Sequence, residues 1–140
     1  MKLSSLFLPL ALALAACSST PAPVDPSAGL LTDRTSLAGT WTGTWTEQTT
    51  DSTRLEGTAS LTIDPQGKVN GALDNQTLNL KGAITGVLND KGYFTGEVDY
   101  PNAKVNGEGQ VGVKGAQLIG TLDIKRAGQK IGTLSFALSH

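Results

Sequence analysis

Alternation of apolar and polar residues over Leu37 to Glu47 is the feature that most constrains the fold of this chain. Odd positions in this stretch carry leucine, glycine and tryptophan as far as Trp45, whereas the even positions from Thr40 onward are all threonine. A period of two is typical of a β-strand with one buried face and one solvated face. Later segments repeat the arrangement, so the sequence predicts an all-β meander of antiparallel strands.

Short turns divide the rest of the chain into strands. Only one connection, from Gln48 to Arg54, is long. The eight predicted strands cover residues 37–47, 55–63, 68–74, 78–88, 93–100, 103–113, 117–125 and 129–138.

Each turn also predicts a register, because loop length determines which residues face each other across a hairpin. We expect two-residue loops at Asn75–Gln76, Pro101–Asn102 and Gly115–Ala116, and a last turn around Arg126–Gly128. The predicted pairs are Ile63 with Val69, Leu73 with Leu78, Leu88 with Phe94, Val98 with Val105, Val111 with Gly120, and Leu122 with Gly132. All of them place apolar residues or glycines on one common face.

Glycine recurs on the apolar face of every predicted strand, for example at Gly43, Gly57 and Gly107. Glycine inside a strand costs roughly 0.5–1 kcal/mol relative to alanine, so its repetition needs a structural reason. In a closed barrel, glycines allow strands to coil and leave room for bulky interior side chains. We therefore predict a small eight-stranded up-and-down barrel. Its interior aromatic residues are Trp41, Trp45, Phe94, Tyr100 and Phe136.

The segment Gly39-Thr40-Trp41 resembles the G-x-W motif that opens the barrels of the calycin superfamily, the lipocalins and avidins; Gly43-Thr44-Trp45 is a second candidate. The resemblance implies a barrel that binds a small ligand. It also implies that the motif tryptophan packs at the closed end against a basic residue of the last strands, Arg126 or Lys130. Avidin-type biotin sites need tryptophans from several strands. A biotin site is therefore not expected, because both tryptophans here lie on the first predicted strand.

The N-terminal residues 1–16 have the features of a secretory signal, with Lys2 followed by an apolar run too short to span a bilayer permanently. The run ends in Leu14-Ala15-Ala16-Cys17, which resembles the bacterial lipobox. This resemblance implies cleavage before Cys17, lipid attachment to its thiol, and acylation of the new amino group. Ser18 in the next position favours delivery to the outer membrane. The alternative is an ordinary signal peptide that leaves Cys17 as a free thiol.

Amino-acid composition indicates the domain organisation and excludes several kinds of site. Residues 17–36 are rich in proline and serine and are expected to be a tether, followed by a barrel domain at residues 37–140. Eleven basic and 12 acidic residues give a net charge of −1, which gives no indication of a nucleic-acid partner. The single cysteine and the single histidine, His140, exclude an intrachain disulfide and the usual zinc ligand sets.

No catalytic constellation is visible, and we predict a protein that is not an enzyme and has no cofactor or metal. The one grouping of acids is Glu97, Asp99 and Glu108 on the polar faces of two neighbouring strands. A glycosidase-like carboxylate pair or a calcium site there is the alternative to an ordinary solvated strand face. The predicted register sets Glu97 opposite Asn106 and Asp99 opposite Lys104, which favours the solvated face.

Two hypotheses about the function of this protein are favoured over the others. In the first, the interior aromatic residues Trp41, Trp45, Phe94, Tyr100 and Phe136 line a site for an apolar small molecule at the mouth near the Gln48–Arg54 loop. In the second, the same side chains fill the barrel, and a ligand-free lipoprotein contacts an envelope protein through its threonine-rich exterior or a sheet edge. A third alternative turns the apolar face outward toward lipid. A cavity of roughly several hundred cubic ångströms, open at one end, distinguishes the first class from the second.

Overall fold

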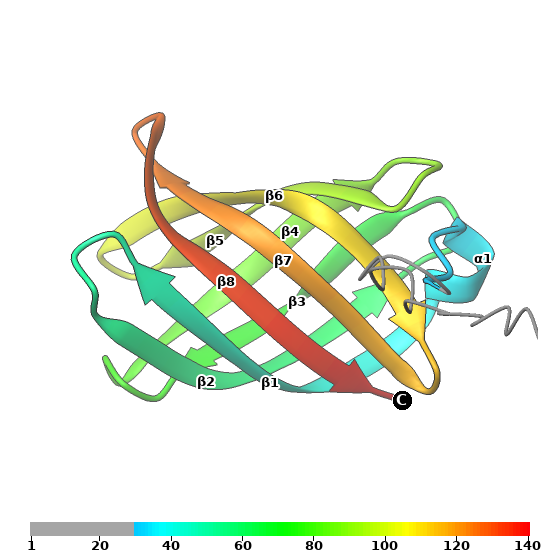
Figure 1. Cartoon of the computed structure of the whole chain (residues 1–140), viewed down its shortest axis with the longest axis horizontal. Coiled ribbons are helices and arrows are strands. Elements are labelled where there is room, and N and C mark those ends of the chain that lie inside the picture. Colours follow the sequence, from blue (N-terminus) through cyan, green and yellow to red (C-terminus); the bar gives the residue numbers. More distant parts are fainter. Residues whose placement is uncertain (1–29) are drawn as a thin grey trace, which may run out of the picture.

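The computed structural model of this chain describes residues 30–140, which form eight antiparallel strands closed into a barrel (Figure 1). The predicted all-β class, the strand number and the up-and-down order are confirmed. The strands are β1 (Gly39–Thr49), β2 (Arg54–Ile63), β3 (Lys68–Asn75), β4 (Leu80–Leu88), β5 (Tyr93–Tyr100), β6 (Ala103–Lys114), β7 (Gln117–Arg126) and β8 (Gln129–Ser139). The predicted signal peptide and Cys17 lie outside the described residues.

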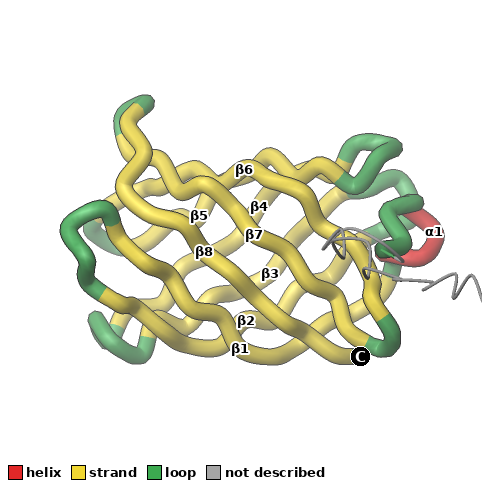
Figure 2. Tube along the Cα trace, in the orientation of Figure 1, coloured by secondary structure: helices red, strands yellow, loops and turns green. Residues whose placement is uncertain are grey.

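Pairing between the first and the last strand closes the barrel. In the β1–β8 ladder, Trp45 faces Phe136 and Glu47 faces Leu134. Figure 2 shows the strands following one another around the wall without an interruption. Since each strand has a neighbour on both sides, the described sheet has no open edge.

Four of the predicted hairpin registers are confirmed. Ile63 faces Val69, Leu88 faces Phe94, Val98 faces Val105, and Val111 faces Gly120. Tight turns set the first two of these registers. Gly67 and Gly92 in these turns adopt positive φ angles of 88° and 77°, which glycine tolerates best.

The predicted register of the β3–β4 hairpin is wrong. Leu73 faces Gly82 rather than Leu78, because the connection is a four-residue loop from Gln76 to Asn79 instead of Asn75–Gln76. Asn75 continues β3 and is buried, and its Oδ1 accepts a hydrogen bond of 3.0 Å from the backbone N–H of Leu78. That bond stabilises the longer loop, and β4 starts only at Leu80.

The predicted register of the β7–β8 hairpin is wrong as well. Leu122 faces Leu134 rather than Gly132. The turn has two residues, Ala127 and Gly128, whose φ angles of 52° and 80° fit a type I′ turn. A β-bulge between Ile124 and Lys125 then shifts the register by one residue, so that Ile124 faces Gly132 and Leu122 faces Leu134.

One end of the barrel is covered by the short helix α1 (Arg34–Leu37), seen at the right of Figure 1. Asp33 caps the helix, and its Oδ1 accepts a 2.7 Å hydrogen bond from the N–H of Ser36. Leu37 is the last residue of α1 rather than part of the predicted first strand, and its side chain is 0% exposed. Leu31 pairs with Val113 at the same end, which we call the closed end. Between residues 30 and 140, no helix has the length and apolar character needed to cross a membrane.

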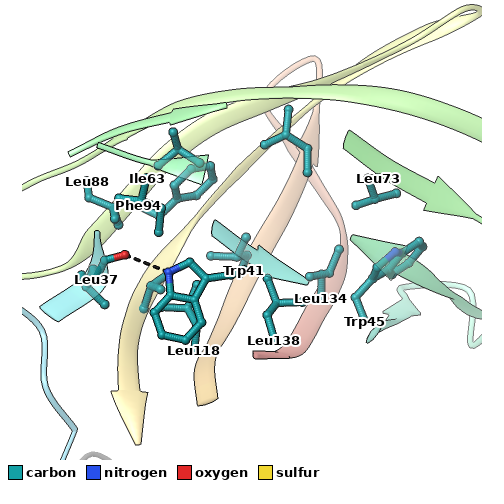
Figure 3. Close-up of a cluster of buried hydrophobic side chains, with 14 of the residues drawn as sticks. Leu37, Trp41, Trp45, Ile63, Leu73, Leu88, Phe94, Leu118, Leu134 and Leu138 are labelled. Atoms are coloured by element: carbon teal, nitrogen blue, oxygen red, sulfur yellow. Dashed lines mark hydrogen bonds between the residues drawn. The ribbon is translucent and has the colours of Figure 1, made fainter. Parts of the chain in front are cut away.

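The apolar face of the strands points into the barrel, as predicted. Side chains from all eight strands meet there in a single buried cluster, part of which is drawn in Figure 3. The alternative in which this face points outward is wrong for the described chain, because the buried side chains include Trp41, Ile63, Val69, Ile84, Leu88, Phe94, Leu118, Leu122, Leu134 and Leu138.

Candidate functional site

The closed end is tightly packed around Trp41. Its indole N–H donates a 2.9 Å hydrogen bond to the carbonyl oxygen of Leu37, drawn as a dashed line in Figure 3. The calycin resemblance implies that Arg126 or Lys130 packs against the motif tryptophan. This prediction is wrong for Trp41, because the side chain that packs against its indole ring is His140. Arg126 and Lys130 lie in the β7–β8 hairpin at the opposite end. Trp41, a predicted ligand-binding residue, lines neither of the interior spaces described next.

The opposite, open end contains a cavity of about 380 Å³. Its walls come from the ends of the strands and from the β1–β2 loop, which the sequence placed at the mouth of a binding site. The apolar part of the wall includes Leu55, Leu80 and Val105, and the polar part includes Glu47, Asn75 and Tyr100. The volume lies in the range of small-molecule sites.

A second, smaller space of about 60 Å³ lies deeper in the barrel. Its lining is entirely apolar and includes three of the predicted aromatic residues, Trp45, Phe94 and Phe136. Four side chains line both spaces, so this inner chamber adjoins the mouth cavity: Leu73, Val98, Ile124 and Leu134. In Figure 3, Trp45 lies among Leu73, Leu134 and Leu138, away from Trp41. The interior is therefore graded from a polar mouth to an apolar chamber.

Glu47 is the carboxylate on the inner wall of the mouth cavity. Only 8% of this residue is exposed, and burial raises the pKa of its carboxyl group above the ordinary value. The ion pairs found within residues 30–140 all involve other side chains. Gly132 leaves the space that the carboxylate occupies, since a Cβ atom there would lie 2.5 Å from its Oε1.

Tyr100 and Asn75 complete the polar part of the wall. Burial raises the pKa of the Tyr100 hydroxyl, the nearby Asn75 side chain acts in the opposite direction, and the charge of Glu47 adds to the increase. The Tyr100 ring lies over Gly82, where an added Cβ atom would come within 3.1 Å of two ring carbons. The influence of Glu47 and Asn75 on Tyr100 places all three polar groups in one electrostatic environment.

Two charged residues stand at the rim of the same cavity. Asp51 belongs to the β1–β2 loop, and hydrogen bonds from Thr49 and Thr53 lower the pKa of its carboxyl group. Arg126 ends β7 at the neighbouring β7–β8 hairpin and is exposed. The mouth therefore carries two carboxyl groups and one guanidinium group.

The acids on the outer surface are arranged as the predicted register requires. Glu97 faces Asn106 and forms an ion pair of 3.4 Å with Lys104, and Glu108 forms an ion pair with Lys125. Both pairs are partly exposed to solvent. Among residues 30–140, no three potential metal ligands gather in one place. These side chains are thus engaged in surface ion pairs.

Glu47 and Asn75 are the site residues that sequence reasoning missed. The sequence patterns predict no role for Glu47, and they predict Asn75 in a two-residue loop. The available signal was position, because Glu47 has the same parity as Trp45, and Asn75 the same parity as Leu73. Alternation of side chains along a strand places both pairs on the inner face.

The fold and the cavity together define the class, a small closed barrel with an internal cavity that opens at one end. No known protein family, curated protein or solved structure matched this chain.

Proposed function

We propose that this chain is a lipid-anchored lipoprotein of the bacterial envelope whose barrel binds an apolar small molecule without catalysing a reaction. The observation that carries the proposal is the cavity of about 380 Å³ at the open end, backed by an entirely apolar inner chamber. A ligand-free structural role is less well supported, because it requires side chains that fill the interior to normal density.

The interior offers the usual source of affinity for an apolar ligand. Removing apolar surface from water stabilises a complex by roughly 25 cal/mol per Å². The chamber is walled by leucine, valine, isoleucine and aromatic side chains on a closed sheet, so the site is formed before the ligand arrives. A preformed site avoids the entropy loss of ordering loops on binding.

The anchor proposal rests on the sequence of the leader and of the lipobox ending at Cys17. Several acyl chains, at about 0.8 kcal/mol per buried CH₂ group, would hold the barrel at a membrane. Leu31 pairs with Val113 at the closed end, so the described chain starts at the end opposite the mouth. The outer membrane is the proposed location of the anchor at Cys17.

Two measurements on the protein from its source organism test this proposal. Radiolabelled palmitate should be incorporated into the wild-type chain and not into a Cys17→Ser variant. The mature chain (residues 17–140) carrying Cys17→Ser can be purified without detergent, and native mass spectrometry should then detect an apolar molecule of less than roughly 500 Da, a mass suited to a cavity of this class. Absence of the label would refute the anchor. A mass equal to that of the bare chain, together with no uptake of an apolar fluorescent dye, would refute the binding function.

A further inference from the structure

We propose that the ligand is an amphiphile whose amine head group pairs with Glu47 at the mouth and whose apolar tail enters the inner chamber beside Trp45. This inference rests on the proposed binding function and adds the chemical class of the ligand. It depends on one buried acid, on the charges around it and on the position of the chamber.

Glu47 is placed as a receptor for a cation or an N–H donor. It is 8% exposed and lies on the cavity wall, and the ion pairs within residues 30–140 use other residues. Buried charged groups in proteins are normally paired, because an unpaired one loses the solvation that stabilises its charge. Loss of solvent is also the only cause that acts on its pKa. The Glu47 carboxylate oxygens are not among the fully buried, unpaired side-chain atoms of residues 30–140, so they remain open to the cavity, where a ligand amine can pair with them.

The other charged and polar groups at the mouth also favour a positively charged ligand head group. Asp51 adds a second carboxylate, and Arg126 adds one guanidinium on the exposed rim. A ligand carboxylate could reach Arg126, but Glu47 and Asp51 would repel it. An ammonium group has three N–H donors, and the oxygen of Tyr100 on the same wall can accept a second hydrogen bond.

The inner chamber sets the nature of the tail. Trp45, Phe94 and Phe136 line it, and none of its wall is polar. The chamber adjoins the mouth cavity at Leu73 and Leu134, so a linear alkyl chain can extend from a head group at Glu47 into the barrel. Trp45 is then in contact with the tail, and its fluorescence reports on occupancy.

The test uses three ligands with the same tail and different heads: octylamine, octanol and octanoate. Each is titrated at neutral pH into the mature chain carrying Cys17→Ser, with Trp45 fluorescence and calorimetry as readouts. We expect octylamine to bind at least tenfold more tightly than octanoate. Glu47→Gln should weaken octylamine binding at least tenfold and change octanol binding less than twofold.

Glu56→Gln is the matched control. Glu56 lies on β2 near the same end of the barrel, but its side chain is 61% exposed and pairs with Arg54 on the outer surface. This substitution removes the same charge without touching the cavity, so octylamine affinity should stay within about twofold. Unchanged octanol binding shows that the Glu47→Gln variant is folded with its chamber intact.

The outcomes separate the two proposals. If octanoate binds as tightly as octylamine, or if Glu47→Gln leaves octylamine affinity unchanged, the amine assignment is refuted while binding itself stands. An equal loss in Glu56→Gln also refutes the pairing with Glu47, because it shows a general effect of charge. If none of the three ligands binds, the proposed binding function fails and the amine assignment fails with it.

Discussion

The imidazole ring of His140 stacks on the indole of Trp41, with ring centroids 3.6 Å apart and planes tilted by 30°. Nδ1 of His140 also lies 3.1 Å from the carbonyl oxygen of Thr40. Gly39 makes this contact possible, because a Cβ atom there would lie 2.7 Å from Cε1 of His140. Its φ of 133° is likewise a conformation that residues with a side chain rarely adopt. His140 thus covers the end of the barrel at which β1 begins.

We expect His140→Ala to lower the free energy of unfolding by about 1 kcal/mol, since aromatic pairs contribute about 0.5–1.5 kcal/mol beyond their buried area. Urea denaturation at neutral pH measures this change. Lys130→Ala is the informative control, because Lys130 was the alternative partner and forms only a half-exposed ion pair with Asp123. Such a pair contributes little, so a loss in Lys130→Ala equal to that in His140→Ala would contradict the assignment of the contact with Trp41 to His140.

The architecture could be predicted because period and turn chemistry act locally. The alternation of residues predicts which face of each strand points inward, and this prediction holds although two of the predicted registers are wrong. Leu73 faces Gly82 instead of Leu78, and Leu122 faces Leu134 instead of Gly132. These shifts are of four and two residues, and an even shift leaves each side chain on its own face. The errors arose where a side chain or a bulge, rather than a turn motif, determines loop length.

The cavity could not be predicted in the same way. Periodicity shows which side chains point inward, but it does not show whether their volumes fill the space enclosed by a barrel. Glu47 illustrates the limit. Its parity pointed inward, yet acids are almost never buried without a partner, and composition therefore favoured the outer face. Only the closed structure shows that Gly132 opens the space beside it.

Ala127 should be a site where stability can be raised. It occupies the first position of a type I′ turn with φ of 52°, a left-handed conformation that costs a non-glycine residue about 1–2 kcal/mol. Asparagine tolerates this conformation better, so Ala127→Asn should raise the thermal midpoint by stabilising the fold by up to about 1 kcal/mol.

Ala116 provides the comparison for that substitution. It sits in the Gly115–Ala116 turn, where the positive φ of 62° belongs to Gly115 and not to the alanine. Ala116→Asn should therefore leave the midpoint unchanged. A similar gain at both alanines would show that the stabilisation does not come from relief of the left-handed conformation.

Stability should depend on pH through Glu47. Burial raises the pKa of Glu47 in the folded state above the ordinary value of 4.5, which applies to the unfolded chain. The folded protein then retains a proton that the unfolded chain has already lost. The contribution of this group to stability therefore falls as pH rises from the unfolded value through the raised folded value, and is constant above it.

Glu47→Gln removes this dependence, because glutamine does not titrate. In urea denaturation at several values between about pH 4 and pH 8, the variant should lack the decline that wild type shows just above the ordinary pKa of glutamate. At neutral pH it should be at least as stable as wild type. Parallel pH profiles for the two proteins would show that the carboxyl group of Glu47 is not desolvated.

Two inward-facing glycines should respond oppositely to alanine. A Cβ atom at Gly57 would lie 1.8 Å from the carbonyl oxygen of Asp74, so the β2–β3 ladder must shift. At Gly107 the nearest atom, Cδ1 of Ile124, would be 3.4 Å away, an ordinary contact at the wall of the inner chamber. We expect Gly57→Ala to cost about 2–3 kcal/mol and Gly107→Ala to be neutral or stabilising in urea denaturation. Equal losses would contradict the presence of open space beside Gly107.

The same position tests where the ligand tail lies. Gly107→Leu adds an isobutyl group that projects toward Leu122 and Phe94, into the chamber that the tail would occupy. Binding of octylamine should weaken at least tenfold, whereas butylamine, whose shorter tail places fewer carbons in the chamber, should lose less than threefold. Because Glu47 lines the mouth cavity and Gly107 lines only the inner chamber, the pairing of Glu47 with the amine head should persist in both complexes. Calorimetry with the two amines measures the difference, and an equal loss for both chain lengths would place the tail outside the barrel.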